Sequence, residues 1–252
     1  MKVAMLGAGA FGTALGGILA DNGYDVDFYD PKFERENLKD VVGGAMVIVL
    51  CAPSTAAPYL LPHLPKDTPL VIATKGILTD EVFHEFKDYM VISGPGFAED
   101  IKAAKQTKMT ITDNRLKKLF GADYMNFDQT KDKKGVLMCG ALKNIYAMLA
   151  GYNGLKRDSL EWKDYITKVA REMKDILAFN GAKSETVDLV CGISDLELTC
   201  DFPSRNYEYG NLLKKDSSCE PEKTVEGLSA LRRIRRGEIR VPDSALILKG
   251  ML

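Results

Sequence analysis

The 252-residue chain is poor in histidine, has no closely paired cysteines and contains no long apolar run. Its two histidines, His63 and His84, are too few and too badly placed for a metal cluster, so we expect no metal. No apolar stretch reaches the roughly 18 residues needed to cross a bilayer, so we expect no membrane span. The net charge of −1 offers no general attraction for nucleic acid or for an anionic membrane.

The five cysteines form no C-x-x-C pair, and their number is odd. No signal peptide is recognisable, so we expect free thiols and a cytoplasmic location. The densest basic run covers residues 232–236 and is interpreted as a solvated helix face.

A glycine pattern follows the first short apolar segment, residues 1–6. Gly7, Gly9 and Gly12 have the spacing G-x-G-x-x-G, and helix-compatible residues come next. In a dinucleotide site the first glycine allows the sharp turn, the second lets the backbone approach a pyrophosphate, and the third lets strand and helix pack closely. The alternative is a purely structural turn between a strand and a helix.

An acidic residue closes the second expected strand, residues 24–29. Asp30 lies 18 residues beyond Gly12, where a Rossmann unit places the carboxylate that binds the ribose 2′-OH. The alternative is that Asp30 caps the turn before Pro31. Strand, glycines, helix, strand and acid in this order favour a dinucleotide site.

Further apolar runs alternate with short helical stretches through the first half of the chain. This pattern predicts an α/β fold, with an N-terminal Rossmann-type doubly wound parallel sheet over residues 1–130. Residues 107–112 alternate in polarity as a half-exposed edge strand would, and 124–130 resemble another edge strand. Residues 135–155 and 161–182 have helical patterns, so we expect an all-α C-terminal domain over 131–252. The other expected strands are 45–54, 69–76 and 89–96.

Polar residues interrupt the apolar pattern of the helical half. Lys143 and Asn144 lie within an apolar helix, where an unpaired ammonium is costly. Lys143 could instead extend to the surface or pair with a carboxylate. Residues 204–206, Ser-Arg-Asn, suit a bound phosphate, although a capped helix with a surface arginine explains them equally well.

The chain resembles the NAD-dependent glycerol-3-phosphate dehydrogenases. The stretches that carry the resemblance are, in order, GAGAFGTALG, CAPS, ATKGI, SGPGFAED, GALKNIYAMLAG, GISDLELTC, SRNYEYG and VEG. They extend over nearly the whole chain. The resemblance implies interconversion of dihydroxyacetone phosphate and sn-glycerol 3-phosphate with NAD, allows NADP as well, and implies a supply of glycerol 3-phosphate for phospholipid synthesis. It is also compatible with a homodimer.

The resemblance also implies roles for individual residues. Lys143 would act as general acid or base at the C2 oxygen, with Lys75 and Asp195 completing the catalytic group. The implied substrate-binding residues are Lys75, Gly94, Lys143, Asn144, Asp195, Ser204, Arg205 and Asn206. The implied cofactor-binding residues are Gly7, Gly9, Ala10, Phe11, Gly12, Asp30, Pro53, Lys75, Ala98, Arg205, Thr224 and Glu226.

The chain departs from the family pattern in four places. Gly96 stands where the family usually has a serine, which removes one substrate contact, and the segment between Asp30 and Ala45 is much shorter than usual. The stretch LKRDSLEWKD after Gly154 replaces a turn with glycine and asparagine, and Lys168 stands where an arginine is common. Two alternatives therefore stay open: a dehydrogenase of the same fold for another small hydroxy substrate, and a non-catalytic dinucleotide sensor.

Overall fold

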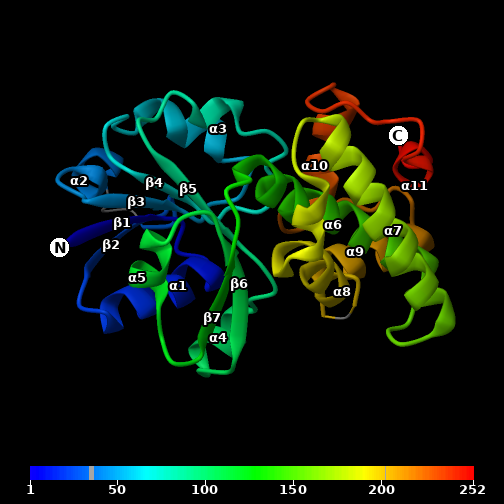
Figure 1. The fold of residues 1–252 in the computed structure, drawn as a ribbon, viewed down its shortest axis with the longest axis horizontal. Coiled ribbons are helices and arrows are strands. Elements are labelled where there is room, and N and C mark those ends of the chain that lie inside the picture. Colours follow the sequence, from blue (N-terminus) through cyan, green and yellow to red (C-terminus); the bar gives the residue numbers. More distant parts are fainter. Residues whose placement is uncertain (34–36, 202) are drawn as a thin grey trace. The chain divides into compact units, whose positions relative to one another are not determined.

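The chain divides into two compact units in a computed structural model that describes residues 1–33, 37–201 and 203–252. The sheet unit comprises residues 1–74 and 80–133, and the helical unit comprises 75–79 and 134–252. Figure 1 shows the strands and the long helices in separate parts of the chain. The predicted domain boundary near residue 130 places residues 75–79 in the sheet domain, whereas the structure groups them with the helices.

The sheet unit is built on a seven-stranded sheet with the strand order β2-β1-β3-β4-β5-β6-β7. Neighbouring strands are parallel from β2 to β5, which confirms the predicted doubly wound arrangement. Strands β1, β3, β4 and β5 are mostly apolar and buried, as expected for a sheet covered on both faces, whereas the edge strand β2 alternates polar and apolar residues and is partly exposed. The strands are β1 (Lys2–Leu6), β2 (Asp25–Tyr29), β3 (Val47–Leu50), β4 (Leu70–Ile72), β5 (Tyr89–Ser93), β6 (Thr107–Ile111) and β7 (Met125–Gln129).

Strand β6 corrects two predictions. It pairs antiparallel with β5, so the sheet is not wholly parallel, and it lies inside the sheet rather than at its edge. Lys108 is exposed, but the other polar residues of the stretch 107–112 are threonines whose side chains are buried. Thr110 is fully buried, and the Thr112 hydroxyl accepts a hydrogen bond from the backbone N–H of Val91 at 2.8 Å. The other expected edge strand, β7, does lie at the edge.

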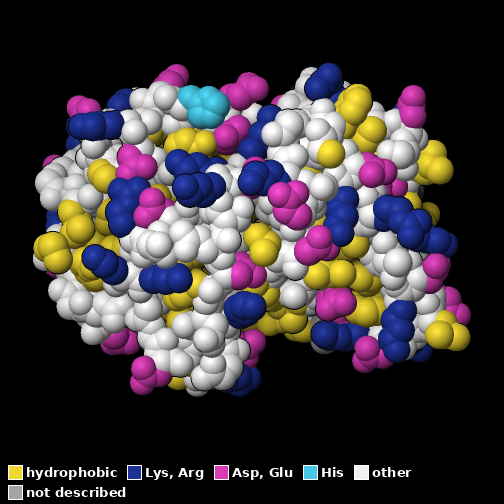
Figure 2. Space-filling view, in the orientation of Figure 1, with side chains coloured by type: hydrophobic (Ala, Val, Ile, Leu, Met, Phe, Trp, Pro, Cys, Tyr) yellow, Lys and Arg dark blue, Asp and Glu magenta, His cyan; other side chains and the backbone are white. Residues whose placement is uncertain are grey.

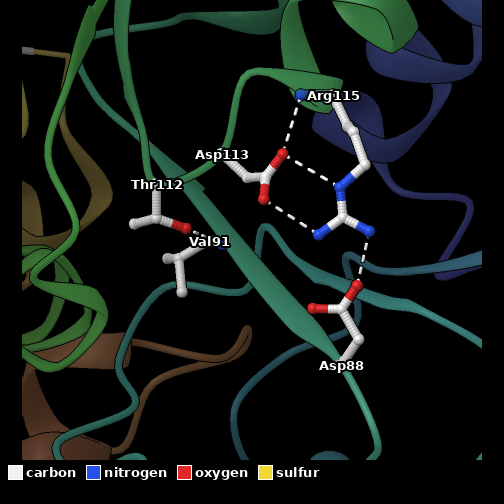
Figure 3. A network of polar contacts seen from close by, with 5 residues as sticks. All are labelled: Asp88, Val91, Thr112, Asp113 and Arg115. Carbon is white, nitrogen blue, oxygen red and sulfur yellow. Dashed lines mark hydrogen bonds and ion pairs between the residues drawn. The ribbon is translucent and has the colours of Figure 1, made fainter.

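A charged network holds the chain where β6 leads into helix α5 (Arg115–Phe120), as Figure 3 shows. The Arg115 guanidinium donates to both carboxylate oxygens of Asp113 at 2.9 Å and to Asp88 at 2.5 Å. Asp88 directly precedes β5. The network therefore ties the start of α5 to the beginning of the strand that pairs antiparallel with β6.

Helices cover both faces of the sheet. Helix α1 (Ala10–Asp21) contacts α4 (Ala98–Lys102) and α5, and Figure 1 shows α2 (Leu38–Val42) and α3 (Ala57–Leu60) on the other face. The apolar side of α1 packs on the central strands, and Leu15 and Leu19 are fully buried there. This packing fixes the start of α1 at the carboxyl end of β1.

The helical unit is organised around helix α6 (Lys133–Asn153), which agrees with the predicted helix at 135–155. Helix α7 (Leu160–Phe179) is amphipathic, and the Ser159 side chain caps it by accepting from the Trp162 N–H at 3.1 Å. Helix α6 and helix α9 (Arg205–Lys215) approach closely: a Cβ added to Gly151 would lie 1.9 Å from the Tyr207 carbonyl oxygen. The remaining α-helices of this unit are α8 (Asp195–Thr199), α9 (Arg205–Lys215), α10 (Glu226–Arg235) and α11 (Leu246–Lys249), and short 3₁₀- and π-helical turns (Ser184–Asp188 and Val190–Ser194) precede α8.

A buried carboxylate anchors the C-terminal helix. Glu172 on α7 accepts hydrogen bonds from the backbone N–H groups of Ile247 and Leu248 at 2.8 and 2.7 Å. It also accepts from the Tyr146 hydroxyl at 2.7 Å, so three donors surround one buried acid. The arrangement fastens α11 to the two longest helices of the unit.

Charges of both signs are interspersed on the face that Figure 2 shows, as the small net charge leads one to expect. Within residues 1–33, 37–201 and 203–252, no helix is both long and apolar enough to cross a membrane. Over the same residues, no group of three His, Cys, Asp or Glu side chains is arranged to hold a metal ion.

Candidate active site

The glycine loop of the sheet unit lies between β1 and α1 and adopts the conformation that its pattern predicts. Gly7 has φ +109°, a left-handed conformation that favours glycine, and its N–H donates to the Tyr29 carbonyl at 2.8 Å. A Cβ on Gly12 would lie 2.1 Å from the Gly7 carbonyl oxygen, so only glycine allows this approach of helix to loop. A Cβ on Gly9 would meet no protein atom within 4 Å. Protein packing thus explains Gly7 and Gly12, and leaves open space in front of Gly9.

These features fit a dinucleotide pyrophosphate. Helix α1 begins at Ala10, and no side chain of the described residues caps its first turn. The N–H groups of a helix start carry a partial positive charge and bind phosphate oxygens. The open space at Gly9 lets such a group come close to the backbone. The residues present are therefore suited to hold NAD at this loop.

Asp30 lies beside the glycine loop, directly after β2. One of its carboxylate oxygens accepts from the Ala8 N–H at 2.9 Å, and the other accepts from the Lys32 N–H at 3.1 Å. The second contact is the turn-capping role that we considered for this residue. The first brings the carboxylate to the loop, where the predicted ribose contact requires it.

The other predicted cofactor and substrate residues of the sheet unit follow strand ends or begin helices. Pro53 follows β3, and Ala98 is the first residue of α4. Phe11 packs partly buried against the hydrophobic core. Gly94 follows β5 with φ +153°, and a Cβ there would lie 3.0 Å from Met109 Cα, so close strand packing already accounts for this glycine. The ligand contacts of these residues stay predictions.

Three predicted catalytic residues come together in the helical unit. Lys143 Nζ on α6 lies 2.5 Å from Asp195 Oδ1 at the start of α8. Lys75 Nζ, from the segment 75–79, lies 4.0 Å from the other oxygen of the same carboxylate. Lys143 is 2% exposed and Asp195 1% exposed, whereas Lys75 is 27% exposed. Of the two alternatives for Lys143, surface extension is therefore wrong, because its ammonium is buried beside a carboxylate.

The environment of Lys143 lowers its pKa to about 7. Burial is the main cause, because it disfavours the charged form. The Asp195 carboxylate opposes this shift, and the nearby Lys75 ammonium adds to it by charge repulsion. A lysine with a pKa near neutrality can both accept and donate a proton at physiological pH.

One residue of this cluster was not identified from the sequence. The Lys143 ammonium donates to the Thr199 hydroxyl at 3.1 Å, and that hydroxyl donates to the Asp195 carbonyl at 2.5 Å. Thr199 lies one helical turn after Asp195 on α8 and belongs to the stretch GISDLELTC. The i, i+4 spacing from an expected catalytic carboxylate was the signal that could have revealed it.

Asn144 and Asn206 join α6 to α9. The Asn206 amide N–H donates to Asn144 Oδ1 at 2.8 Å, and Asn144 donates to the Gly140 carbonyl at 2.9 Å. Asn206 Oδ1 also accepts from the Gly227 N–H at 2.9 Å, which brings in the start of α10. These contacts are structural, and a substrate contact of either residue stays a prediction.

Ser204 and Arg205 stand at the start of α9. Ser204 is the residue before the helix, but among the described residues its side chain makes no capping hydrogen bond. Arg205 is exposed, and its guanidinium donates to the Thr224 carbonyl at 3.4 Å. Glu226 is the first residue of α10. The structure therefore brings two predicted cofactor residues, Arg205 and Thr224, into contact.

Comparison with known proteins agrees with this geometry. The family model for the C-terminus of NAD-dependent glycerol-3-phosphate dehydrogenase matches residues 132–240. A glycerol-3-phosphate dehydrogenase (NAD(P)+) from Leptospira biflexa serovar Patoc is 32% identical, over 94% of this chain and 85% of the relative. The same enzyme from Bacillus velezensis is 31% identical, over 87% of this chain and 78% of the relative.

Solved structures extend the likeness to the whole fold. The crystal structure of a glycerol-3-phosphate dehydrogenase from Coxiella burnetii is 26% identical in sequence and has a TM-score of 0.82. The alignment covers all of this chain and 94% of that one. The chain therefore belongs to the family of NAD-dependent glycerol-3-phosphate dehydrogenases.

Proposed function

We propose that this chain interconverts dihydroxyacetone phosphate and sn-glycerol 3-phosphate with NAD(H), and that Lys143 is its general acid and base. The observation that carries the proposal is the buried pair of Lys143 and Asp195 with Lys75 beside it, in a chain whose relatives are named as glycerol-3-phosphate dehydrogenases. In the direction of ketone reduction, the reaction would supply glycerol 3-phosphate for phospholipid synthesis.

Each residue of the group has a defined task. In ketone reduction the Lys143 ammonium gives a proton to the C2 oxygen, and in alcohol oxidation the neutral amine removes the hydroxyl proton. Asp195 holds the ammonium in place at 2.5 Å, and Thr199 accepts a second hydrogen bond from it. Lys75 lowers the pKa of Lys143 and adds positive charge that favours a developing C2 oxyanion. When bound, the nicotinamide cofactor supplies or takes up the hydride.

Other residues would bind the cofactor and the substrate phosphate. Gly7, Gly9 and the start of α1 would hold the pyrophosphate, and Asp30 would hold the adenosine ribose. Arg205 would bind the substrate phosphate, because a guanidinium offers paired donors to phosphate oxygens. The five cysteines are free thiols, which supports a reducing compartment such as the cytoplasm as the site of action.

The test is an assay of NADH consumption with dihydroxyacetone phosphate and with unphosphorylated dihydroxyacetone. We expect turnover of the phosphate ester, and a fall in kcat of about 10²–10⁴ in Lys143→Met with NADH binding retained. Lys168→Met is the matched control, because Lys168 is an exposed lysine on α7, and its kcat should equal that of the wild type.

Other outcomes support the alternatives. Turnover of a different small ketone would favour a dehydrogenase of the same fold with another substrate. Gly96 is compatible with this alternative, because a Cβ at this position would lie no closer than 3.5 Å to its nearest neighbour, Ile101 Cδ1. NADH binding without turnover of any small ketone would favour a dinucleotide sensor. Normal kcat in a folded Lys143→Met variant would remove Lys143 from the mechanism.

A further inference from the structure

The segment 75–79 carries Lys75 but has no regular secondary structure of its own. It leaves the sheet after β4 and belongs to the helical unit. Ile77 and Leu78 are 3% and 0% exposed, so the segment is buried as well as irregular. Buried backbone groups outside helices and strands must find hydrogen-bond partners elsewhere, and such partners decide the path of the chain.

Arg233 on α10 supplies one such partner. Its Nη1 donates to the Gly76 carbonyl oxygen at 2.8 Å, across 157 residues of sequence. Arg233 belongs to the basic run that was interpreted as a solvated face, and for this residue the interpretation is wrong. Its side chain is 23% exposed, whereas Arg232, Arg235 and Arg236 are exposed.

Glu238 fixes the orientation of the Arg233 guanidinium. Nε donates to the two carboxylate oxygens at 2.7 and 2.8 Å, and Nη2 lies 2.6 Å from Oε2. The C-terminus of α10 builds this geometry. Gly237 has φ +85°, and the Glu238 N–H donates back to the Arg233 carbonyl at 3.2 Å, which is a Schellman ending. The chain turns back at this ending, so the Glu238 carboxylate lies beside the Arg233 guanidinium.

We infer that Arg233, oriented by Glu238, is a positioning residue that sets the place of the Lys75 ammonium through the Gly76 carbonyl. The Gly76 carbonyl belongs to the residue directly after Lys75, and Gly76 has φ +94°, so the backbone is held in a left-handed conformation at this point. A charge-assisted hydrogen bond from a doubly held guanidinium suits this purpose, because it is short and directional. The inference rests on the proposed role of Lys143 and adds a residue that does not touch the reacting atoms.

The consequence appears at Lys143. The charged and titratable groups that face its ammonium are Asp195, Lys75 and the buried Cys200 thiol. Asp195 raises the pKa of Lys143 and Lys75 lowers it. If the Lys75 ammonium loses its fixed place, its repulsion weakens and the pKa of Lys143 moves up toward the ordinary lysine value.

The experiment measures the pKa of Lys143 in the full chain by NMR titration of ¹³Cε-labelled lysine, with the resonance assigned by Lys143→Met. We expect Arg233→Met to raise this pKa by about one pH unit, and Arg233→Lys to recover part of the difference, because an ammonium donates but lacks the planar fork. Arg236→Met is the matched control. It removes the same charge from the exposed end of α10 and should leave the pKa unchanged.

A second variant guards against a folding defect. Glu238→Gln keeps Arg233 and removes only the charge that orients it, so it should raise the pKa in the same direction by a smaller amount. An unchanged pKa of Lys143 in folded Arg233→Met would overturn the inference. If Arg233→Met does not fold, an unchanged pKa of Lys143 in both Arg233→Lys and Glu238→Gln would overturn it. The titration needs no turnover, so a chain that fails to reduce dihydroxyacetone phosphate would refute the proposed function and still test the role of Arg233.

Discussion

Replacement of Asp195 by asparagine removes the carboxylate from the buried cluster and changes the shape of the side chain little. Lys143 then keeps the Thr199 hydroxyl but loses its counter-charge at 2.5 Å. Removing one partner of a buried ion pair costs about 3–5 kcal/mol when the other partner stays charged. Lys143 can escape much of this cost by losing its proton, so the destabilisation must depend on pH.

The sign follows from the proton balance. In the wild type the pKa of Lys143 is about 7 when folded and about 10.5 when unfolded, so the unfolded state holds more protons between these values and stability rises across that window. In Asp195→Asn the folded pKa is lower, because the carboxylate that raised it is gone. The destabilisation should therefore grow by about 1.4 kcal/mol per pH unit as the pH falls below about 7.

The assay is urea denaturation at about pH 6 and about pH 9. The single tryptophan, Trp162, is buried in the helical unit and donates to the Cys200 carbonyl at 3.0 Å, so its fluorescence reports this unit. The control compares Lys143→Met/Asp195→Asn with Lys143→Met. Neither chain has Lys143, so the destabilisation caused by Asp195→Asn should be the same at both pH values. Equal destabilisation of Asp195→Asn at both pH values would refute the reasoning.

Three further predictions use the same structure. Asp30→Asn should weaken the preference for NADH over NADPH by about 1–3 kcal/mol, measured as the ratio of the two kcat/KM values, because a carboxylate repels a 2′-phosphate; an unchanged ratio would place Asp30 away from the ribose. Arg205→Ala should raise KM for the phosphorylated substrate by about one to two decades with partial recovery in Arg205→Lys, and equal reduction of unphosphorylated dihydroxyacetone would contradict the assignment. Glu172→Gln should lower the free energy of unfolding by about 1–3 kcal/mol, seen in urea denaturation, because an amide offers only one acceptor oxygen to the three donors that Glu172 satisfies.

Local sequence patterns were enough to locate the main elements. The apolar runs, the glycine spacing and the position of Asp30 predicted β1, the loop, α1 and β2, because strand and turn preferences act over a few residues. Lys143 was identified for a similar reason, since a lysine within an apolar helix requires a partner or a function. The resemblance added the residues that complete the candidate site.

Strand β6 shows where local patterns fail. The polar alternation over residues 107–112 predicted an edge, but threonines can be buried when their hydroxyls are hydrogen-bonded, as that of Thr112, directly after β6, is to the Val91 N–H. Strand β6 pairs antiparallel with β5, the strand before it in the chain, and alternation alone does not distinguish an antiparallel from a parallel pairing.

Composition and residue spacing did not show which residues meet; the tertiary structure shows it. Lys75 lies on a segment that follows a strand, yet it packs with the helices and faces Asp195 from 120 positions earlier in the chain. Arg233 reaches the Gly76 carbonyl from within a run that looks solvated. Contacts of this kind depend on chain paths set by the whole core, and sequence spacing alone does not specify those paths. The sequence by itself determined the chemistry available to this chain, and the fold determined which of those groups share one buried site.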